Sequence, residues 1–161
     1  SFRNGRLIIM DIRDSLATLQ LLNTRVPELT IENDFVTLPS KEETETSLEL
    51  GDVGHAIEKR DDAYVGVLQL RIHSITKSKK SNKKIEFSIV VEGIFKFDGD
   101  NKEMFEQMLF LNGNSSLYSI ARSHIINMTS LSFASGQIIL PMLNFVKIAE
   151  QLKQGEAKVS E

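Results

Sequence analysis

The chain of 161 residues contains no cysteine and no long apolar run. The absence of cysteine excludes disulfide bonds, thiolate metal ligands and cysteine nucleophiles together. Near the start, the apolar run from Leu7 to Met10 ends at Asp11, so it is too short for the core of a signal peptide or for a membrane span. These absences favour a cytoplasmic protein.

A strongly basic charge is also lacking, because the formal net charge is −3. No overall field therefore favours nucleic acid as a partner. The local exception is KSKKSNKK, from Lys77 to Lys84, which places five lysines in eight positions. Such a cluster can hold an anionic partner, but between two strand-like segments it more often forms a solvated hairpin tip that protects the sheet edges from aggregation.

The composition is that of an ordinary globular protein, with 41% apolar and 25% charged residues. A chain of this length can bury a core as a single domain. Near the start of the chain, apolar residues recur three and four positions apart, at Ile9, Ile12, Leu16 and Leu19. This spacing predicts a short amphipathic helix from Ile9 to about Gln20.

A first strand is predicted after Pro27, which prevents a helix from continuing and favours an extended conformation before it. From Glu28 onward apolar and polar residues alternate, as they do in a half-buried strand. The segment SKEETETS, residues 40–47, is polar and charged. We expect a solvated loop there, with Leu48 and Leu50 following it.

The clearest feature is a pair of long strands joined by the lysine-rich turn. In the segment from Tyr64 to Ile75, Tyr64, Leu68, Leu70 and Ile72 fall on one face, and apolar residues alternate again from Ile85 to Val91. This pattern predicts an antiparallel hairpin. Gly93 then interrupts the alternation, and the apolar residues after it follow a shifted phase, which predicts a bulge or bend.

Helices are predicted for the rest of the chain. Residues 102–111 carry an apolar stripe, and NGN at residues 112–114 is expected to end that helix. Ser115 or Ser116 then caps a second helix, whose broad apolar face extends from Leu117 to Met128. Pro141 opens the last helix, and the polar residues 155–161 are expected to fray.

No arrangement of residues indicates catalysis. His55, His73 and His124 show no metal-ligand spacing, and the chain has no glycine-rich phosphate loop or nucleophile elbow. Asp98 and Asp100 resemble the start of a calcium loop, but the glycine and the last glutamate are not at the required spacing. We therefore interpret that segment as a turn with helix-capping residues, and we expect no enzyme activity, metal or cofactor.

The stretch LYSIARSHIINMTS, residues 117–130, combines polar side chains that a catalytic site could use with apolar side chains that form one face of a helix. Arg122 and His124 are two positions apart, so on a helix they point to different sides and do not form an acid/base pair. We expect Arg122 to hold buried carbonyls or a carboxylate. The segment is then an amphipathic helix that lines either a groove or a subunit interface.

Several motifs together resemble the SecB-type protein-export chaperones. EKRDDAYVGVLQLRIHS and IEFSIVVEGIFKF are similar to the paired strands of that family, which read Asp-Asp-x-Tyr, a strand, a turn, a second strand and Gly-Ile-Phe. Gly136 followed by ILPMLNF is similar to the approach to its last helix. The positions that match its second helix are Leu117, Tyr118, Ala121 and Arg122.

The resemblance runs from Glu28 to Gln154 and implies an α+β fold. In that fold a four-stranded antiparallel sheet carries helices on one face, and the chains assemble through sheet edges and helices into a homotetramer, a dimer of dimers. It implies three parts: residues 1–24 as an N-terminal extension with the short helix, residues 25–154 as the SecB-like domain, and residues 155–161 as a flexible tail. Ser119 and Ile120 depart from the family, which has a proline and an aromatic residue there.

The resemblance also implies a function without catalysis. Members of the family bind unfolded polypeptides or preproteins in a hydrophobic groove, keep them competent for translocation in protein export, and pass them to the SecA motor. For each residue of such a groove, packing into the core is an equally good interpretation. By position, the client-binding residues are Leu48, Leu50, Ile85, Phe87, Tyr118 and Ile120.

The family's SecA-binding surface is an acidic patch on the outer face of the sheet. The corresponding positions are Glu28, Glu32, Glu86 and Ser88, so only part of the patch is present. An alternative is therefore a dedicated SecB-like chaperone of one partner, such as an antitoxin.

Overall fold

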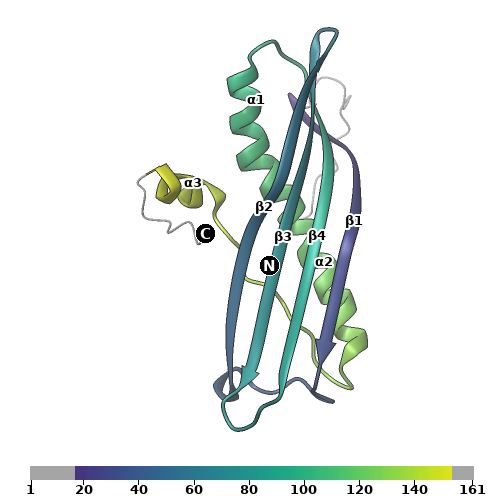
Figure 1. Ribbon diagram of the computed structural model, residues 1–161, viewed down its shortest axis with the longest axis vertical. Coiled ribbons are helices and arrows are strands. Elements are labelled where there is room, and N and C mark those ends of the chain that lie inside the picture. Colours follow the sequence, from purple (N-terminus) through teal and green to yellow (C-terminus); the bar gives the residue numbers. More distant parts are fainter. Residues whose placement is uncertain (1–16, 154–161) are drawn as a thin grey trace, which may run out of the picture.

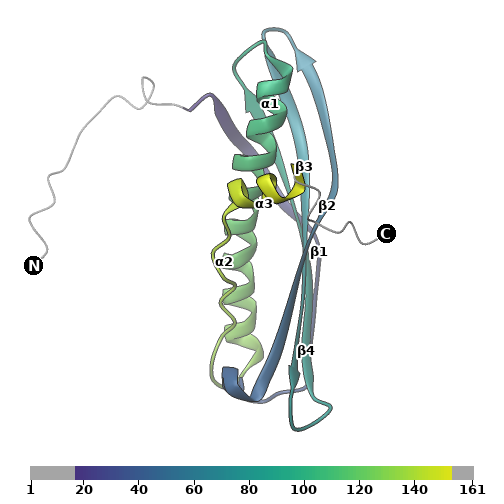
Figure 2. The same cartoon turned by 90° about the vertical axis from the view of Figure 1, so that its left-hand side faces the viewer.

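The computed structural model describes residues 17–153, in which four strands form one antiparallel sheet in the order β1-β4-β3-β2. The strands are β1 (Leu19–Asn33), β2 (Thr44–Arg60), β3 (Ala63–Ser78) and β4 (Lys84–Phe97). Within the described range, the helices cover one face of this sheet, here called the inner face, and leave the outer face uncovered (Figures 1 and 2). The predicted α+β class, with a four-stranded antiparallel sheet and helices on one face, is confirmed.

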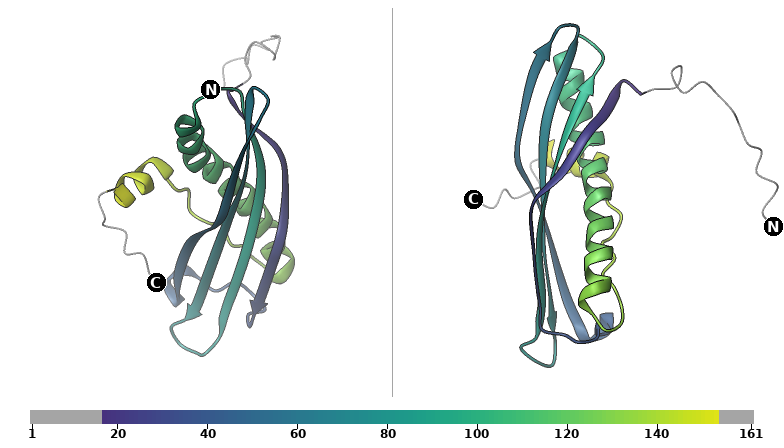
Figure 3. Two further views of the ribbon diagram at one scale, coloured as in Figure 1. Left: turned by 45° about the horizontal axis from the view of Figure 1, so that its top comes forward. Right: turned by 90° about the vertical axis from the view of Figure 1, so that its right-hand side faces the viewer.

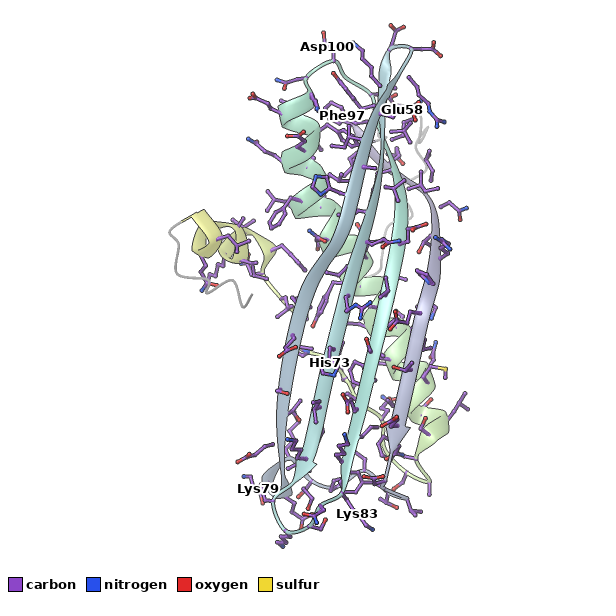
Figure 4. All side chains as sticks on the ribbon, in the orientation of Figure 1. Glu58, His73, Lys79, Lys83, Phe97 and Asp100 are labelled. Carbon is purple, nitrogen blue, oxygen red and sulfur yellow. The ribbon has the colours of Figure 1, made fainter. Side chains whose placement is uncertain are left out.

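The predicted hairpin is confirmed as β3 and β4. Alternate side chains of both strands are buried against the helices, beginning at Tyr64 in β3 and at Ile85 in β4, because successive side chains of a strand point to opposite faces. The lysine-rich turn joins the two strands at one end of the molecule, where Figure 4 shows Lys79 and Lys83.

The bulge predicted at Gly93 is absent, because β4 pairs with β3 without a register shift. Gly93 continues the buried set of β4, together with Phe95 and Phe97. Register shifts occur instead in the neighbouring β1, one of them between Arg25 and Glu28. Pro27 lies within that shift, and a proline cannot donate a hydrogen bond to the sheet.

The loop predicted at residues 40–47 is wrong from Thr44 onward. A short 3₁₀ turn, η2 (Lys41–Glu43), leads directly into β2, which therefore includes Leu48 and Leu50. Their Cα partners in β3 are Ser74 and Ile72. The sequence pattern is weak because β2 is an edge strand with a single neighbour, so most of its side chains reach water.

The helix predicted from Ile9 to Gln20 overlaps the described residues only at its end. There Leu19 and Gln20 belong to β1 and pair with Phe97 and Lys96. The sheet therefore begins before residue 25, the predicted start of the domain. Ala17 and Thr18 are not helical either. Residues 9–16 of that helix, like the predicted tail at residues 155–161, lie outside the described residues.

One continuous helical segment crosses the inner face, made of α1 (Lys102–Met108), the π-helical turn η3 (Leu109–Gly113) and α2 (Asn114–Ser132). Asn101 caps it, since its Oδ1 accepts a hydrogen bond of 3.1 Å from the backbone N–H of Met104. This confirms the predicted capping turn.

The helix end predicted at residues 112–114 is wrong, because the chain passes through them as a π-turn. Gly113 keeps helical dihedral angles, and a Cβ there would lie 3.0 Å from Leu68. A glycine is therefore needed for close approach to the sheet rather than for a turn. Ser116 does not cap α2. Its hydroxyl donates a hydrogen bond to the Asn112 carbonyl oxygen, one turn earlier in the helical segment.

After α2 the chain returns along that helix as an extended segment, residues 133–144, here called the strap (Figure 2). Pro141 lies within the strap, so the predicted start of the last helix is wrong; α3 (Phe145–Lys153) begins after Asn144. Asn144 supplies the cap, because its Oδ1 accepts a hydrogen bond from the backbone N–H of Lys147 at 3.1 Å.

Within residues 17–153 no helix is long and apolar enough to cross a membrane.

The core lies between the inner face of the sheet and the helical segment. Phe105 of α1 is fully buried and stacks on two rings of the sheet, Phe97 at 5.4 Å and Tyr64 at 5.9 Å between centroids. Gly66 of β3 makes room for this ring, since a Cβ at Gly66 would lie 2.8 Å from Phe105 Cζ. The glycine thus allows α1 to sit directly on β3.

Candidate functional site

A hollow of about 620 Å³ lies between α1, η3 and α3. One wall is formed by Phe110 and Leu111 of η3, and the facing wall by Ala149 and Leu152 of α3. These side chains are only partly buried. The hollow is therefore an apolar surface that is open to water.

A second hollow of about 240 Å³ continues the first toward the edge of the sheet. It reaches Ile57 and His55 of β2, and it shares Glu106 and Phe110 with the first hollow. The two hollows are therefore adjacent and lie between β2 and α3. We call the pair the α1 groove.

The rim of the α1 groove carries carboxylates. Glu103 and Glu106 of α1 border the larger hollow, and both side chains are exposed. Glu106 Oε1 lies 3.8 Å from Lys102 Nζ, one turn away on the same helix. Such an exposed pair contributes little stability. The rim is thus solvated, and the apolar character of the groove is confined to its walls.

The chemistry of this groove is that of a binding surface. An open apolar wall next to an edge strand accommodates an extended peptide segment through burial of apolar area. Among residues 17–153, no three or more His, Asp or Glu side chains are close enough together to hold a metal ion.

The residues that line the α1 groove were not among the predicted site residues. Phe110 lies outside the helical period of the apolar stripe in residues 102–111, whereas Leu111 continues that stripe three positions after Met108, so only Phe110 was a usable signal. The residues of the opposite wall could not be predicted from the sequence. Ala149 and Leu152 lie beside the groove only because the strap leads the chain back along α2 and places α3 there.

The six predicted client-binding residues lie elsewhere. Ile85, Phe87 and Tyr118 are at most 3% exposed and belong to the core. Leu48 and Ile120 are half-buried against that core. Leu50 is 36% exposed on the inner face of the β2 edge. None of the six lines the two hollows of the α1 groove, and their role as client contacts stays a prediction.

The stretch at residues 117–130 holds the strap in place. Side chains of α2 bond the backbone of an extended segment at three points, which fixes the strap against the helix. This agrees with the expectation that Arg122 holds a carbonyl. The bonds run from Arg122 Nε to the Leu140 oxygen at 3.0 Å, from the Tyr118 hydroxyl to the Pro141 oxygen, and from the Ile138 N–H to Thr129 Oγ1 at 2.8 Å.

The four predicted SecA-binding residues share the outer face of the sheet. Glu32 faces Glu86 across the β1–β4 pair, and Ser88 lies one alternate position further along β4. Basic side chains lie among these carboxylates. Arg71 is 3.2 Å from Glu28, while Lys84 and His73 are each 2.8 Å from Glu86. The patch is therefore largely neutralised within the chain.

His73 links three strands across this face. Its Nε2 lies 2.8 Å from Glu86 of β4, and its Nδ1 lies 3.5 Å from Glu49 of β2. Figure 4 labels His73 in the middle of the sheet. The hydrogen bond with Glu86 raises the pKa of His73 above its ordinary value of 6.5, and Glu49 adds to this. The hydrogen bonds from Lys84 and His73 lower the pKa of Glu86.

This linkage predicts a stability that depends on pH. Because folding raises the pKa of His73, its contribution is fully present below about pH 6.5 and is lost as the pH rises through the folded-state value. The difference in unfolding free energy between wild type and His73→Gln, measured in urea, should therefore shrink with rising pH. Glu86→Gln should remove most of this trend, and a trend that survives Glu86→Gln would contradict the assignment.

Comparison of the sequence with protein-family models gives no match, and comparison with curated proteins gives none either. Among solved structures, the fold matches a SecB-like chaperone from Mycobacterium tuberculosis in complex with a ChAD peptide from the HigA1 antitoxin. The match has a TM-score of 0.58 at 14% identity and covers 79% of this chain and 91% of that chain. The predicted resemblance is therefore confirmed for the architecture: the chain has the fold of the SecB-like chaperones.

Proposed function

We propose that this protein is a molecular chaperone without enzymatic activity that binds non-native polypeptides, and that the α1 groove is a binding surface for them. The observation that carries the proposal is a pair of adjacent open hollows with apolar walls that share Phe110, on a fold that is also found in a SecB-like chaperone in complex with a peptide. An unfolded client exposes the apolar side chains that such hollows bury.

The energetics suit a chaperone that binds many sequences. Burial of apolar area stabilises a complex by about 25 cal/mol per Å² before the cost of ordering the client. This term does not depend on a particular sequence. Weak contacts at several sites of an oligomer then add through multivalency, which fits the proposed homotetramer.

The groove predicts the effect of Phe110→Ser on a labelled, unfolded peptide. Loss of one large apolar contact of about 1.5–3 kcal/mol should weaken binding by about tenfold or more. Fluorescence anisotropy measures this affinity. The matched control is Leu131→Ser, because Leu131 is 83% exposed near the end of α2 and does not line the groove. An equal loss of peptide affinity in both variants would contradict a specific role of the α1 groove in binding.

Two kinds of client remain candidates. A role in protein export requires transfer to the SecA motor through an acidic surface, whereas here Arg71 and Lys84 pair with the carboxylates. Steering toward a basic motor surface is correspondingly weaker. This pairing favours the second candidate, a dedicated partner such as an antitoxin, and the M. tuberculosis protein with its antitoxin peptide supports it by analogy.

Size-exclusion chromatography with light scattering separates these candidates. A tetramer that forms a larger soluble complex with a reduced, unfolded test protein supports a general holding chaperone. A tetramer that ignores unfolded chains, but binds the product of a neighbouring antitoxin gene, supports the dedicated chaperone. Absence of binding to either would contradict the proposed function.

A further inference from the structure

The lysine-rich turn, residues 77–84, forms one end of the elongated molecule, and α1 lies at the other end (Figures 1 and 3). The turn contains five lysines, two serines, one asparagine and no apolar residue. Its side chains therefore offer charge and hydrogen bonds rather than an apolar surface. A partner that binds at this end is separate from the α1 groove.

Hydrogen bonds hold the turn in one shape. The backbone N–H of Ser78 donates to the Lys83 oxygen at 2.9 Å, and Ser78 Oγ accepts from the backbone N–H of Lys80 at 3.1 Å. The backbone N–H of Lys79 donates to the Glu43 oxygen of η2 at 2.9 Å, so a neighbouring segment braces the turn. The lysines thus start from fixed backbone positions, which lowers the cost of ordering when a partner binds.

Two of the five lysines already have a carboxylate partner. Lys80 Nζ lies 3.5 Å from Glu43, and Lys84 Nζ lies 2.8 Å from Glu86. The other three are exposed and form no ion pair with any residue of the described range 17–153: Lys77, Lys79 and Lys83. Their ammonium groups are therefore available to an anionic partner.

The uncompensated charge is concentrated at the apex of the turn. Lys77 and Lys84 form the last pair of the β3–β4 ladder, and Lys77 also faces Glu45 of β2 as its Cα partner. Lys79 and Lys83 lie beyond that last pair, and Figure 4 shows both at this end of the molecule. The turn therefore displays positive charge on a convex tip.

A hollow of about 250 Å³ opens on the turn, and only polar side chains line it. They are Lys77, Ser78, Ser81, Asn82, Lys83 and Lys84. Each of these side chains can donate a hydrogen bond, and three of them are cations. The lining therefore suits an anionic group that accepts hydrogen bonds, and a phosphate is such a group.

The surroundings of the tip favour a flat anionic surface over a nucleic acid. The net charge is −3, and the exposed carboxylates Glu32 and Glu45 lie on the strands beside the turn. A polyanion that extends along the sheet would meet these carboxylates, whereas a flat surface touches the tip alone. Because charges are screened within about 8 Å at physiological ionic strength, carboxylates further from the surface repel it little.

We infer that the lysine-rich turn docks the protein reversibly on an anionic lipid surface, with Lys79 and Lys83 against the headgroup phosphates. The turn has no apolar residue to insert, so the contact is electrostatic and stays at the membrane surface. Each lysine near such a surface strengthens binding by about fivefold. The contact does not involve the α1 groove, so the protein can hold a client and touch the lipid at the same time.

Co-sedimentation with lipid vesicles tests this docking on the full chain, without any peptide. One set of vesicles contains phosphatidylglycerol and phosphatidylcholine in equal parts, and the other contains phosphatidylcholine alone. We expect the wild-type protein to bind the anionic vesicles at low salt and not the neutral ones. The partition coefficient should fall steeply as salt is raised, because screening weakens the attraction between exposed charges.

Lys79→Gln with Lys83→Gln should lower the partition coefficient by about 25-fold, since two contacts of about fivefold each are lost. The matched control is Lys59→Gln with Lys147→Gln, which removes the same charge from exposed positions in β2 and α3. It should change the partition coefficient by less than about twofold, because these lysines are more than a screening length from the tip. Both double variants should keep the urea midpoint of the wild type, since all four side chains are exposed.

Three outcomes would overturn the docking. The first is a wild-type protein that does not bind anionic vesicles at low salt, or binds neutral ones equally well. The second is an equal loss in the turn variant and in the control, because net charge alone would then explain binding. The third is tighter, turn-dependent binding of a double-stranded oligonucleotide, measured by anisotropy, which would assign the turn to nucleic acid. Client binding in the α1 groove is tested separately by Phe110→Ser and stands or falls without the turn.

Discussion

Phe87→Ala is expected to lower the free energy of unfolding by about 3–5 kcal/mol, because removal of a buried phenylalanine loses its transfer free energy and leaves a cavity. Phe87 is 1% exposed on the inner face of β4. A domain of this size has only about 5–15 kcal/mol to lose. The variant should therefore unfold at much lower urea concentration, and any loss of peptide binding should follow the unfolded fraction.

Leu50→Ala is the matched comparison for Phe87→Ala. Both residues are predicted client contacts, but Leu50 is 36% exposed at the β2 edge. Its truncation should cost less than about 1 kcal/mol, because part of the side chain is already in water. If Phe87→Ala instead kept its stability and bound the peptide more weakly, Phe87 would be a client contact, as the sequence analysis predicted.

Gly66→Ala is expected to lower stability by about 1–3 kcal/mol through overpacking. Its new Cβ would lie 2.8 Å from Phe105 Cζ and 3.2 Å from Leu109 Cδ2, and Phe105 has no free space in the stack with Phe97 and Tyr64. The helical segment must move away from β3. We expect a lower urea midpoint, together with weaker peptide binding, because Leu109 lines the α1 groove.

The control for this prediction is the same substitution at Gly51 in β2. A Cβ at Gly51 would meet only Arg71 Cβ, at 3.9 Å, which is an ordinary contact. Without strain, alanine for glycine is neutral or stabilises by about 0.4–1 kcal/mol through the unfolded state. Similar losses at both glycines would show that α1 does not press on β3 at Gly66.

The two central strands could be predicted because their pattern is local. Both β3 and β4 have neighbours on each side and bury one face under the helices, so the alternation holds from Tyr64 to Ile72 and from Ile85 to Val91, with Val90 as the exception. Edge strand β2 lacks this constraint, and its start at Thr44 was mistaken for a loop. Exposure of an edge strand weakens the very pattern that identifies a strand.

Glycines were misread for a related reason. Gly93 and Gly113 were interpreted as a bulge and a helix end, which are the local uses of glycine. In the structure both allow close packing: a Cβ at Gly93 would lie 2.8 Å from Leu117 Cδ2, and one at Gly113 would lie 3.0 Å from Leu68 Cδ2. The atoms that require a glycine are distant in sequence, so local rules do not find them.

The predicted SecA-binding residues also show what a local pattern can and cannot predict. Alternation placed Glu28 and Glu32 on the polar side of their strand, because it decides which face a strand residue occupies. The family resemblance then grouped them with Glu86 on the outer face of the sheet, and the structure places all three there. Alternation did not reveal Arg71 and Lys84 among them, since cross-strand partners depend on register. The electrostatic weakness of the patch is therefore a tertiary result.

By itself the sequence determined the class of the fold, the central hairpin and the absence of cysteine chemistry, because each depends on residue type or on a local period. Only the tertiary structure decided which apolar residues are core and which are surface. Phe87 and Phe110 are both phenylalanines in apolar surroundings, but β4 buries the first under α2 while η3 places the second beside α3. Burial depends on what the rest of the chain lays over a residue, and no local pattern contains that information.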